Sequence, residues 1–392
     1  MKITILAYNA HRSCAEGVAR IHYNLYSALK RIEVEVNLLS IIDLHFERTF
    51  TFDNSCVKDA RHEFYIISNN NKASSETLLI PSSSLIDESS IIINGLSSIK
   101  IGVYLRLLNV LGFKKWKFVE SLFFRPFRFF DRCKYLLPFT FKIFVYSPSE
   151  YKYLCKILPF TRSKISLIPP PIDTDHFVKK DKRRSLSMLG LDDLEDKILI
   201  GYFGNPFPDR LPISETFKAL AGLAPKHDIV FVGVFPPYKR RTFLNAIYKI
   251  ARSFNLEKRV LLIEKFIDYS IRPFLYSSFD VLLHLYKWKE APYPFLTVLE
   301  AFSVETPVIT TNYNEIRWAL RNLDYPLFID LTSGVNALSI KSALEKFLNL
   351  RNTEEMETML SSIRARIIRL FSLESVGRRT LKELKGVGCH DE

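Results

Sequence analysis

The sequence predicts an α/β protein in which two domains of similar construction follow one another. Apolar runs typical of buried strands alternate with segments of helical periodicity along most of the chain, and this alternation predicts parallel sheets. The order strand, loop, helix, strand occurs near the start of the chain and begins again near residue 198. The length of 392 residues is enough for two such domains, since a domain typically has about 150 residues.

The first domain opens with a strand over 2–7, where apolar and polar residues alternate. After a polar loop, apolar residues at spacings of three and four predict a helix: Val18, Ile21, Leu25 and Leu29. A second strand over 34–38 completes a β-α-β unit. Residues 68–90 are rich in Ser and Asn and are expected to form a loop. The short apolar runs at 91–93 and 143–145 are typical of buried parallel strands.

The second domain is expected to begin near residue 180, after a charged stretch over 178–196 that we interpret as a linker. A strand starting at residue 198 ends in a glycine loop. Further apolar runs predict the remaining strands, with helical stretches between them: 228–233, 259–263, 280–283 and 307–310. The segment 354–384 is predicted to form a pair of helices.

The composition excludes several classes of protein. The apolar fraction of 47% and the charged fraction of 25% are those of a globular protein and not of a disordered one. The longest apolar run is too short for a membrane-spanning helix, and the first residues do not resemble a signal peptide. Five cysteines without a C-x-x-C pair indicate neither a disulfide scaffold nor a zinc cluster, and favour a reducing cytoplasm.

The net charge of +13 suggests an anionic partner, which is a nucleic acid, a membrane surface or a phosphorylated small molecule. No nucleic-acid-binding motif occurs, so a nucleic-acid partner is not expected. The chain also lacks G-x-G-x-x-G, the Walker lysine loop, H-E-x-x-H and G-x-S-x-G, and its eight His have no metal-ligand spacing. Dinucleotide dehydrogenases, P-loop NTPases, zinc hydrolases and serine hydrolases are therefore disfavoured.

Four short stretches remain as candidates for chemistry, and each also has a simpler structural interpretation. The first, at 16–20 (EGVAR), puts a glycine at a strand-to-helix turn, where free backbone N–H groups collect anions. A plain tight turn explains it equally well. The second, at 168–177 (IPPPIDTDHF), runs into rigid prolines and an acidic turn, which is more typical of an interdomain elbow than of a site.

The other two stretches lie in the second domain. The third, at 204–210 (GNPFPDR), follows a strand at the sheet edge where open α/β folds bind ligands. Arg210 could grip a phosphate there, or it is an exposed loop arginine. The fourth, at 290–302 (EAPYPFLTVLEAF), puts two prolines before a helix whose only acid is Glu300. Ligand hydroxyls could bond this carboxylate, whose burial would otherwise be costly; alternatively it reaches the surface or caps a loop.

In this order and spacing, the stretches resemble the retaining glycosyltransferases of the GT-B architecture, group 1 or family 4 type. The resemblance covers nearly the whole chain and is clearest over 143–311, where these segments follow one another as in that family: YSPSEYKYL, IPPPIDTDHF, GYFGNPFPDR, FVG, LYSSFDVLLH and FLTVLEAFSVETPVITT. It implies two Rossmann-like domains that face a central cleft. Residues 1–178 would receive the acceptor, 179–370 would bind the nucleotide-sugar, and a C-terminal helix over 371–392 would cross back to the first domain.

The resemblance implies site residues only where positions match. Glu300 matches the second Glu of the family's E-x7-E motif, which is expected to hold the ribose hydroxyls. Arg210 matches the cation that neutralises the donor diphosphate, and Gly17 matches a glycine of the first domain near that diphosphate. Further donor-binding positions are Gly204, Asn205, Lys265, Phe295, Leu296 and Thr297. Fixed cations and N–H dipoles would stabilise the leaving diphosphate, so neither a metal nor a cofactor is expected.

Three positions depart from the family pattern. Pro292 stands where the first Glu of the motif would fall, and Glu290 is the candidate replacement, which makes Arg210, Glu290 and Glu300 the expected catalytic residues. Asn205 stands where the family has a second phosphate-binding Arg, and the first domain's usual His has no match. The implied function is hexose transfer from a nucleotide-sugar to a lipid-linked or saccharide acceptor, with retention. The alternative is a catalytically impaired GT-B protein that binds nucleotide-sugars or serves as a scaffold partner.

The stretch 113–144 combines eight basic residues and two acids with twelve aromatic residues. Cations beside aromatic rings are what an interfacial segment needs, because rings enter the headgroup region while Lys and Arg meet anionic lipid. The expectation is therefore a cytoplasmic protein that associates with the inner face of the membrane through this stretch. A buried aromatic core with a solvated basic rim is the alternative.

Overall fold

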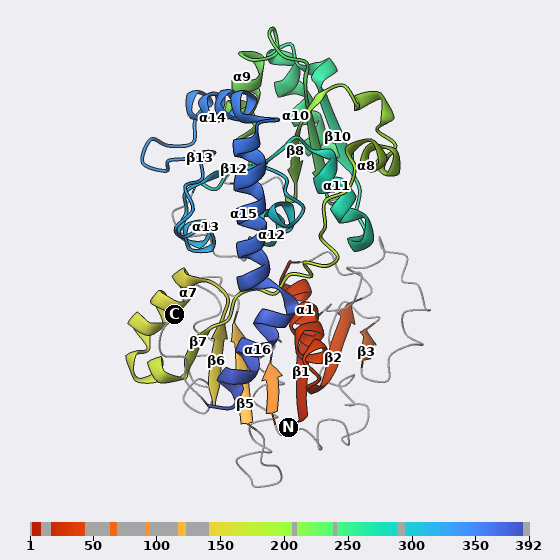
Figure 1. Ribbon diagram of the computed structural model, residues 1–392. Helices are drawn as coiled ribbons and strands as arrows, with labels where there is room; N and C mark the ends of the chain where they lie inside the picture. Colours follow the sequence, from red (N-terminus) through yellow and green to blue (C-terminus); the bar gives the residue numbers. More distant parts are fainter. Residues whose placement is uncertain are drawn as a thin grey trace. The chain divides into compact units, whose positions relative to one another are not determined.

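The computed structural model describes most of the chain: residues 2–8, 17–43, 63–68, 91–94, 117–122, 141–205, 210–237, 241–287 and 295–386 (Figure 1). These residues fall into two compact units. The first consists of the described residues up to Ile172 and those from Leu370 onward, and the second of those from Asp173 to Arg369. Each unit has a parallel sheet of its own.

The first unit ends within the proline-rich stretch, at Ile172, whereas the sequence-based division lies after residue 178. Ile172 still belongs to the first unit because its N–H donates to the carbonyl of Phe371 at 2.7 Å. Phe177, in contrast, packs in the second unit, where its ring centroid lies 5.3 Å from that of Tyr269. The boundary between the two units therefore falls inside the stretch 168–177, which the sequence analysis interprets as one interdomain elbow.

The sheet of the first unit has the strand order β3-β2-β1-β4-β5-β6-β7. Its elements are β1 (Lys2–Tyr8), α1 (Gly17–Arg31), β2 (Glu35–Asp43), β3 (Glu63–Ser68), β4 (Ile91–Asn94), β5 (Lys117–Leu122), β6 (Lys142–Val145), α7 (Pro148–Ile157), the 3₁₀ helix η2 (Pro159–Lys164), β7 (Ile165–Leu167) and α16 (Leu373–Leu384). The strands predicted at the start of the chain, at 91–93 and at 143–145 are confirmed. In α1, Ile21, Leu25 and Leu29 are buried as the periodicity predicts.

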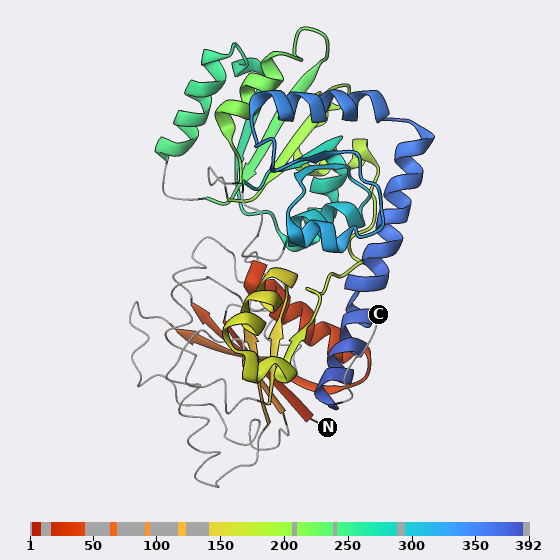
Figure 2. The same ribbon diagram turned by 90° about the vertical axis from the view of Figure 1, so that its left-hand side faces the viewer.

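Helix α16 lies against α1 within the first unit (Figures 1 and 2). The contact is close because Gly377 has no side chain: a Cβ there would come within 2.5 Å of the carbonyl oxygen of Ala28. At the far end of the helix, the carboxylate of Glu383 accepts hydrogen bonds from Lys142 Nζ at 3.2 Å and from Ser166 Oγ at 2.5 Å. These contacts attach the last helix to the sheet of the first unit.

The sheet of the second unit has the strand order β10-β9-β8-β11-β12-β13. Its strands are β8 (Ile198–Phe203), β9 (Ile229–Phe235), β10 (Val260–Glu264), β11 (Val281–His284), β12 (Val308–Thr311) and β13 (Phe328–Ile329). Its helices are α8 (Lys182–Leu189), η3 (Asp192–Leu194), α9 (Ile213–Ala221), α10 (Arg241–Ser253), η4 (Glu257–Arg259), η5 (Tyr269–Ile271), α11 (Arg272–Ser278), α12 (Leu296–Ser303), α13 (Asn314–Ala319) and α14 (Ala337–Leu350). Helix α15 (Glu354–Phe371) leads from this unit into α16, so the predicted pair of closing helices is confirmed.

The interpretation of 178–196 as a linker is wrong, because this stretch folds into α8 and η3. Asp181 caps α8 by accepting from the N–H of Arg184, and Gly190 ends it at φ 70°, a left-handed conformation that glycine adopts without strain. Leu186 is buried as α8 packs against α11. One buried leucine among charged residues was too weak a periodic signal to indicate this helix.

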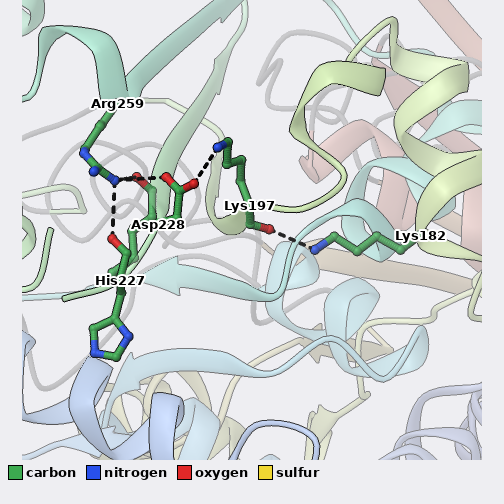
Figure 3. A network of polar contacts seen from close by, with 6 residues as sticks. Lys182, Lys197, His227, Asp228 and Arg259 are labelled. Carbon is green, nitrogen blue, oxygen red and sulfur yellow. Dashed lines mark hydrogen bonds and ion pairs between the residues drawn. The ribbon is translucent and has the colours of Figure 1, made fainter. Parts of the chain in front are cut away.

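A network of charged side chains links the amino ends of neighbouring strands in this sheet (Figure 3). Asp228, just before β9, bonds to Lys197, which precedes β8, and accepts from Arg259 Nη1 at 3.2 Å. On the other side, Lys182 Nζ donates to Asp280 Oδ2, before β11, at 2.7 Å. The bond from Lys197 lowers the pKa of Asp228. At the amino edge of the sheet these charged side chains therefore pair with one another.

Candidate functional site

The sequence-predicted residues of the second unit lie at the opposite edge, after the carboxyl ends of the strands. Gly204, Asn205 and Arg210 follow β8, Lys265 follows β10, and α12 begins after β11. Ligands of open parallel sheets bind at this edge. Glu290 lies outside the described residues, and Gly17 belongs to the first unit, where it begins α1.

The turn after β8 depends on a glycine. Gly204 has φ 136°, which only glycine adopts without strain, and its N–H donates to the carbonyl of Val234 in β9 at 3.1 Å. The next residue, Asn205, accepts a hydrogen bond on its carbonyl from Tyr202 Oη at 2.6 Å. These two bonds hold the start of the loop that carries Arg210.

Arg210 lies among aromatic side chains from the neighbouring strands. Its guanidinium carbon is 5.5 Å from the ring centroid of Tyr286, a distance at which a cation is attracted to an aromatic face. The ring of Tyr286 in turn packs 5.7 Å from that of His284 and 5.4 Å from that of Tyr313. The sequence-based interpretation assigned no role to His284, Tyr286 or Tyr313, because their proximity to Arg210 depends on how the strands are ordered.

Helix α12 starts without a side-chain cap. Its N-cap residue is Phe295, whose side chain cannot accept a hydrogen bond. The first turn therefore presents the N–H groups of Leu296 and Thr297 at the positive end of the helix dipole. The ring of Phe295 lies 6.4 Å from that of Tyr313, so this helix start borders the aromatic cluster around Arg210.

Lys265 follows β10 directly and its N–H donates to the carbonyl of Phe235 at 3.0 Å. Its side chain is exposed. No contact between its ammonium group and Arg210 or α12 connects it to the cluster within the described residues. Its role in donor binding therefore stays a prediction.

Glu300 is buried in α12, with 2% of its surface exposed. Its Oε2 accepts from Tyr276 Oη at 2.6 Å, and its Oε1 lies 3.7 Å from Arg272 Nη1. A buried carboxylate is tolerated when it is paired and hydrogen-bonded in this way. The sequence left open that Glu300 reaches the surface or caps a loop. In the structure it does neither.

The partners of Glu300 are four residues apart in α11, on one face of that helix. Burial and the nearby carboxylate raise the pKa of Tyr276 well above its ordinary value, so its hydroxyl stays protonated and donates. The guanidinium of Arg272 lies over the rings of Phe203 and Tyr269, at 5.5 and 5.7 Å. The spacing of Arg272 and Tyr276 opposite the single acid of α12 is a sequence signal that could have predicted this network.

A metal centre would need several ligating side chains close together. Among the described residues, no group of three or more His, Cys, Asp and Glu side chains is arranged to hold a metal ion. Charged groups at the carboxyl edge of the second sheet include Arg210, the Arg272–Glu300 pair and the dipole of α12.

No family model matches the sequence, and no curated protein matches it either. Solved structures do match over the length of the chain. A glycosyltransferase from Rickettsia africae is 16% identical with a TM-score of 0.72, over 99% of this chain and 100% of that one. HepE from Anabaena, solved with UDP and glucose, is 13% identical with a TM-score of 0.71 over the same shares.

A third match is the sucrose-phosphate synthase from Thermosynechococcus elongatus, which is 16% identical with a TM-score of 0.74 and covers 98% of each chain. All three matches extend over both units and both parallel sheets described above. The chain therefore has the fold of the GT-B glycosyltransferases, as the order of its motifs predicted.

Proposed function

We propose that this protein is a glycosyltransferase that transfers a sugar from a nucleotide-sugar to an acceptor, which is lipid-linked or a saccharide. The observation that carries the proposal is the convergence of Arg210, the uncapped start of α12 and the buried Glu300 at one edge of one sheet. A cation and a helix start suit a diphosphate, and a carboxylate suits sugar hydroxyls. HepE, which shares the fold, was solved with UDP and with UDP-glucose.

Each group has a distinct role in this proposal. The bond between the anomeric carbon and the diphosphate oxygen breaks, the acceptor oxygen bonds to that carbon, and the acceptor's hydroxyl proton is released. The departing nucleoside diphosphate gains negative charge, which Arg210 and the N–H groups of α12 stabilise without a metal. Glu300 orients the ribose hydroxyls, and Glu290 supplies the carboxylate that Pro292 cannot. We further propose that the anomeric configuration is retained and that the transferred sugar is a hexose.

A mass-spectrometric screen of UDP-, GDP-, ADP- and dTDP-sugars tests the proposal. We expect one of them to be consumed, with release of the nucleoside diphosphate and, with a suitable acceptor, a glycoside of unchanged anomeric configuration by NMR. Inversion would contradict the proposed retention. Nucleotide-sugar binding without hydrolysis or transfer would favour the impaired binding protein. If the protein neither binds nor turns over any of these nucleotide-sugars, both functions are contradicted.

The role of Arg210 can be tested separately from turnover. Arg210→Ala is expected to weaken binding of the nucleoside diphosphate by about 10- to 100-fold, because a charge-assisted hydrogen bond contributes about 1.5–3 kcal/mol. Binding of the nucleoside alone should change little. Arg252→Ala is the control, since Arg252 is exposed on α10. Equal losses for nucleoside and nucleoside diphosphate would argue against a phosphate contact.

We also propose that the protein works in the cytoplasm at the inner face of the membrane. Most of the basic, aromatic stretch 113–144 lies outside the described residues, apart from 117–122 and 141–144. Support comes from α7 and η2, where Phe160 is 72% exposed and Tyr153 37% exposed. Three cations of the same two helices are also exposed: Lys152, Lys156 and Arg162. Within the described ranges, no helix has the length and hydropathy of a membrane span. The contact that we propose is peripheral, through exposed basic and aromatic side chains.

A further inference from the structure

Three polar side chains from three adjacent strands of the second unit converge on one point. Arg210 follows β8, His284 ends β11 and Tyr313 follows β12, and these strands are neighbours in the sheet. Tyr286 lies among them: its ring is 5.7 Å from that of His284, 5.4 Å from that of Tyr313 and 5.5 Å from the guanidinium carbon of Arg210. We call these four residues the Arg210 cluster.

His284 Nε2 and Tyr313 Oη, both in the Arg210 cluster, are buried without a hydrogen-bond partner among the described residues. Tyr313 is completely buried. Such orphaned groups are rare in folded proteins, because each loses its bonds to water without replacement. Tyr325 shows the usual arrangement, since its buried hydroxyl bonds to both the N–H and the carbonyl of Val308.

The environment keeps both orphaned groups neutral. Burial and the nearby guanidinium of Arg210 lower the pKa of His284 to about 3, so its imidazole is uncharged at neutral pH. Burial and the carboxylate of Glu315 raise the pKa of Tyr313 well above its ordinary value, so its phenol stays protonated. A neutral imidazole with its proton on Nε2 and a protonated phenol are both hydrogen-bond donors. Two donors beside a fixed cation suit an anion.

We propose that His284 Nε2 and Tyr313 Oη bind phosphate oxygens of a ligand held by Arg210. The start of α12 borders the same place through the ring of Phe295, 6.4 Å from that of Tyr313, and its N–H groups favour the same negative charge. That the anion is the diphosphate of a nucleotide-sugar rests on the proposed function. The anion preference itself rests on the Arg210 cluster.

The test measures binding of UDP, GDP, ADP, uridine and inorganic pyrophosphate by calorimetry. Tyr313→Phe removes only the hydroxyl, and His284→Leu removes the ring nitrogens at similar volume. Each variant is expected to bind pyrophosphate about 10-fold or more weakly than the wild type. The same loss is expected for whichever nucleoside diphosphate the wild type binds. His284→Gln, which restores an N–H donor, should recover part of the loss. Binding of uridine should not change.

Unfolding measurements separate a ligand contact from a structural role. Tyr313→Phe should leave the unfolding midpoint unchanged or raise it, because the hydroxyl it removes has no hydrogen-bond partner among the described residues. Tyr325→Phe is the matched control: it should lower the midpoint, since it deprives Val308 of two bonds, and leave phosphate affinity unchanged. Opposite behaviour of these two buried tyrosines is the signature of the proposed site.

The outcomes distinguish this proposal from the proposed function. If Arg210→Ala loses diphosphate affinity while Tyr313→Phe and His284→Leu keep it, the proposal is overturned and the proposed function stands. If the protein binds pyrophosphate with the expected losses but no nucleotide, the anion site is supported and the nucleotide-sugar function is overturned. If neither pyrophosphate nor any nucleotide binds, both are overturned.

Discussion

Glu300 shows how one side chain combines a structural role with a proposed functional one. Its carboxylate is held by Tyr276 and Arg272 inside the second unit. Such pairing fixes the direction of the carboxylate, and a fixed acceptor loses little entropy when a ligand binds. The same pairing means that a loss of activity on substitution is not by itself proof of a ligand contact. Stability and affinity have to be measured together.

Two substitutions make that separation. Glu300→Gln removes the charge opposite the buried Arg272 and is expected to lower the free energy of unfolding by about 1–3 kcal/mol. It should also weaken nucleoside diphosphate binding by about 10-fold or more. Tyr276→Phe should cost about 1–2 kcal/mol of stability but weaken that affinity less than Glu300→Gln does, because the carboxylate itself remains. Denaturant titration and calorimetry check both. Unchanged affinity in Glu300→Gln would contradict the assignment of Glu300 to the donor.

His284 predicts a pH dependence of stability with a definite sign. Its pKa of about 3 lies below the ordinary 6.5, so the unfolded chain binds the proton more readily than the folded protein does. The contribution of His284 therefore becomes destabilising as pH falls from 6.5 toward 3 and is constant above that window. The slope for one proton is at most about 1.4 kcal/mol per pH unit.

The His284→Gln variant has no titratable group at this position, so its stability can be compared with that of the wild type at each pH. The difference in unfolding free energy between the two proteins should stay constant above pH 7 and shift in favour of the variant on acidification to about pH 4.5. Urea titrations at several pH values measure it. Parallel curves for the two proteins would show that His284 titrates normally and that Arg210 and burial do not hold it neutral.

The packing of α16 on α1 depends on the absence of a side chain at one position. Gly377 brings the helix backbone against Ala28, where a Cβ would come within 2.5 Å of the carbonyl oxygen. A contact this short between a side chain and backbone cannot be relieved by a rotamer change, so one of the helices has to move. The attachment of the closing helix to the first unit is therefore sensitive to a single methyl group.

Gly377→Ala is expected to lower the free energy of unfolding by about 1–2 kcal/mol, because the steric cost exceeds the roughly 1 kcal/mol that alanine contributes in a helix. Gly222→Ala is the control: its Cβ would find its nearest neighbours at 3.4 Å, and its φ of −72° suits any residue. That variant should stay within about 0.5 kcal/mol of the wild type. Equal thermal midpoints for both variants would contradict the close packing.

The net charge of +13 is a property of the chain as a whole, and it favours association with anionic surfaces of many kinds. A specific membrane contact needs more than charge, because apolar groups must enter the lipid as well. Within the described residues of the first unit, α7 and η2 offer this combination: Lys152, Tyr153, Lys156, Phe160 and Arg162.

Co-sedimentation with liposomes tests whether that surface matters. We expect binding to anionic vesicles, weakened by salt, and little binding to neutral ones. The combination Lys152→Glu, Lys156→Glu and Phe160→Ser should abolish most of it, since each basic residue near an anionic surface contributes about 1 kcal/mol. The control combines Lys226→Glu, Lys258→Glu and Met188→Ser on exposed positions of the second unit, with the same change of charge. Equal losses of liposome binding in the two triple variants would indicate that net charge alone, and not this surface, causes the binding.

Apolar patterning along the chain was sufficient to predict two parallel sheets and most of their strands. The apolar run of β8 and the apolar positions of α1 are local features. Residues 199–202 of β8 and Ile21, Leu25 and Leu29 of α1 are buried in the structure. The patterning missed β3 and β5, and it took α8 for a linker. In α8 only a few residues are buried, so its helical nature depends on packing against α11, which no local pattern reveals.

The candidate site was predictable only in part for the same reason. Gly204, Arg210 and Glu300 were recognised from the order of motifs, because each lies in a segment with its own local signature. His284 was not recognised, since it meets Arg210 only after crossover connections bring β8 and β11 side by side. Tyr276 was not recognised either, although its spacing from Arg272 is a local signal, because its contact with Glu300 depends on the packing of α11 on α12. Residue types and their spacing are properties of the chain, whereas pairing, burial and shifted pKa values arise from neighbours that the fold supplies.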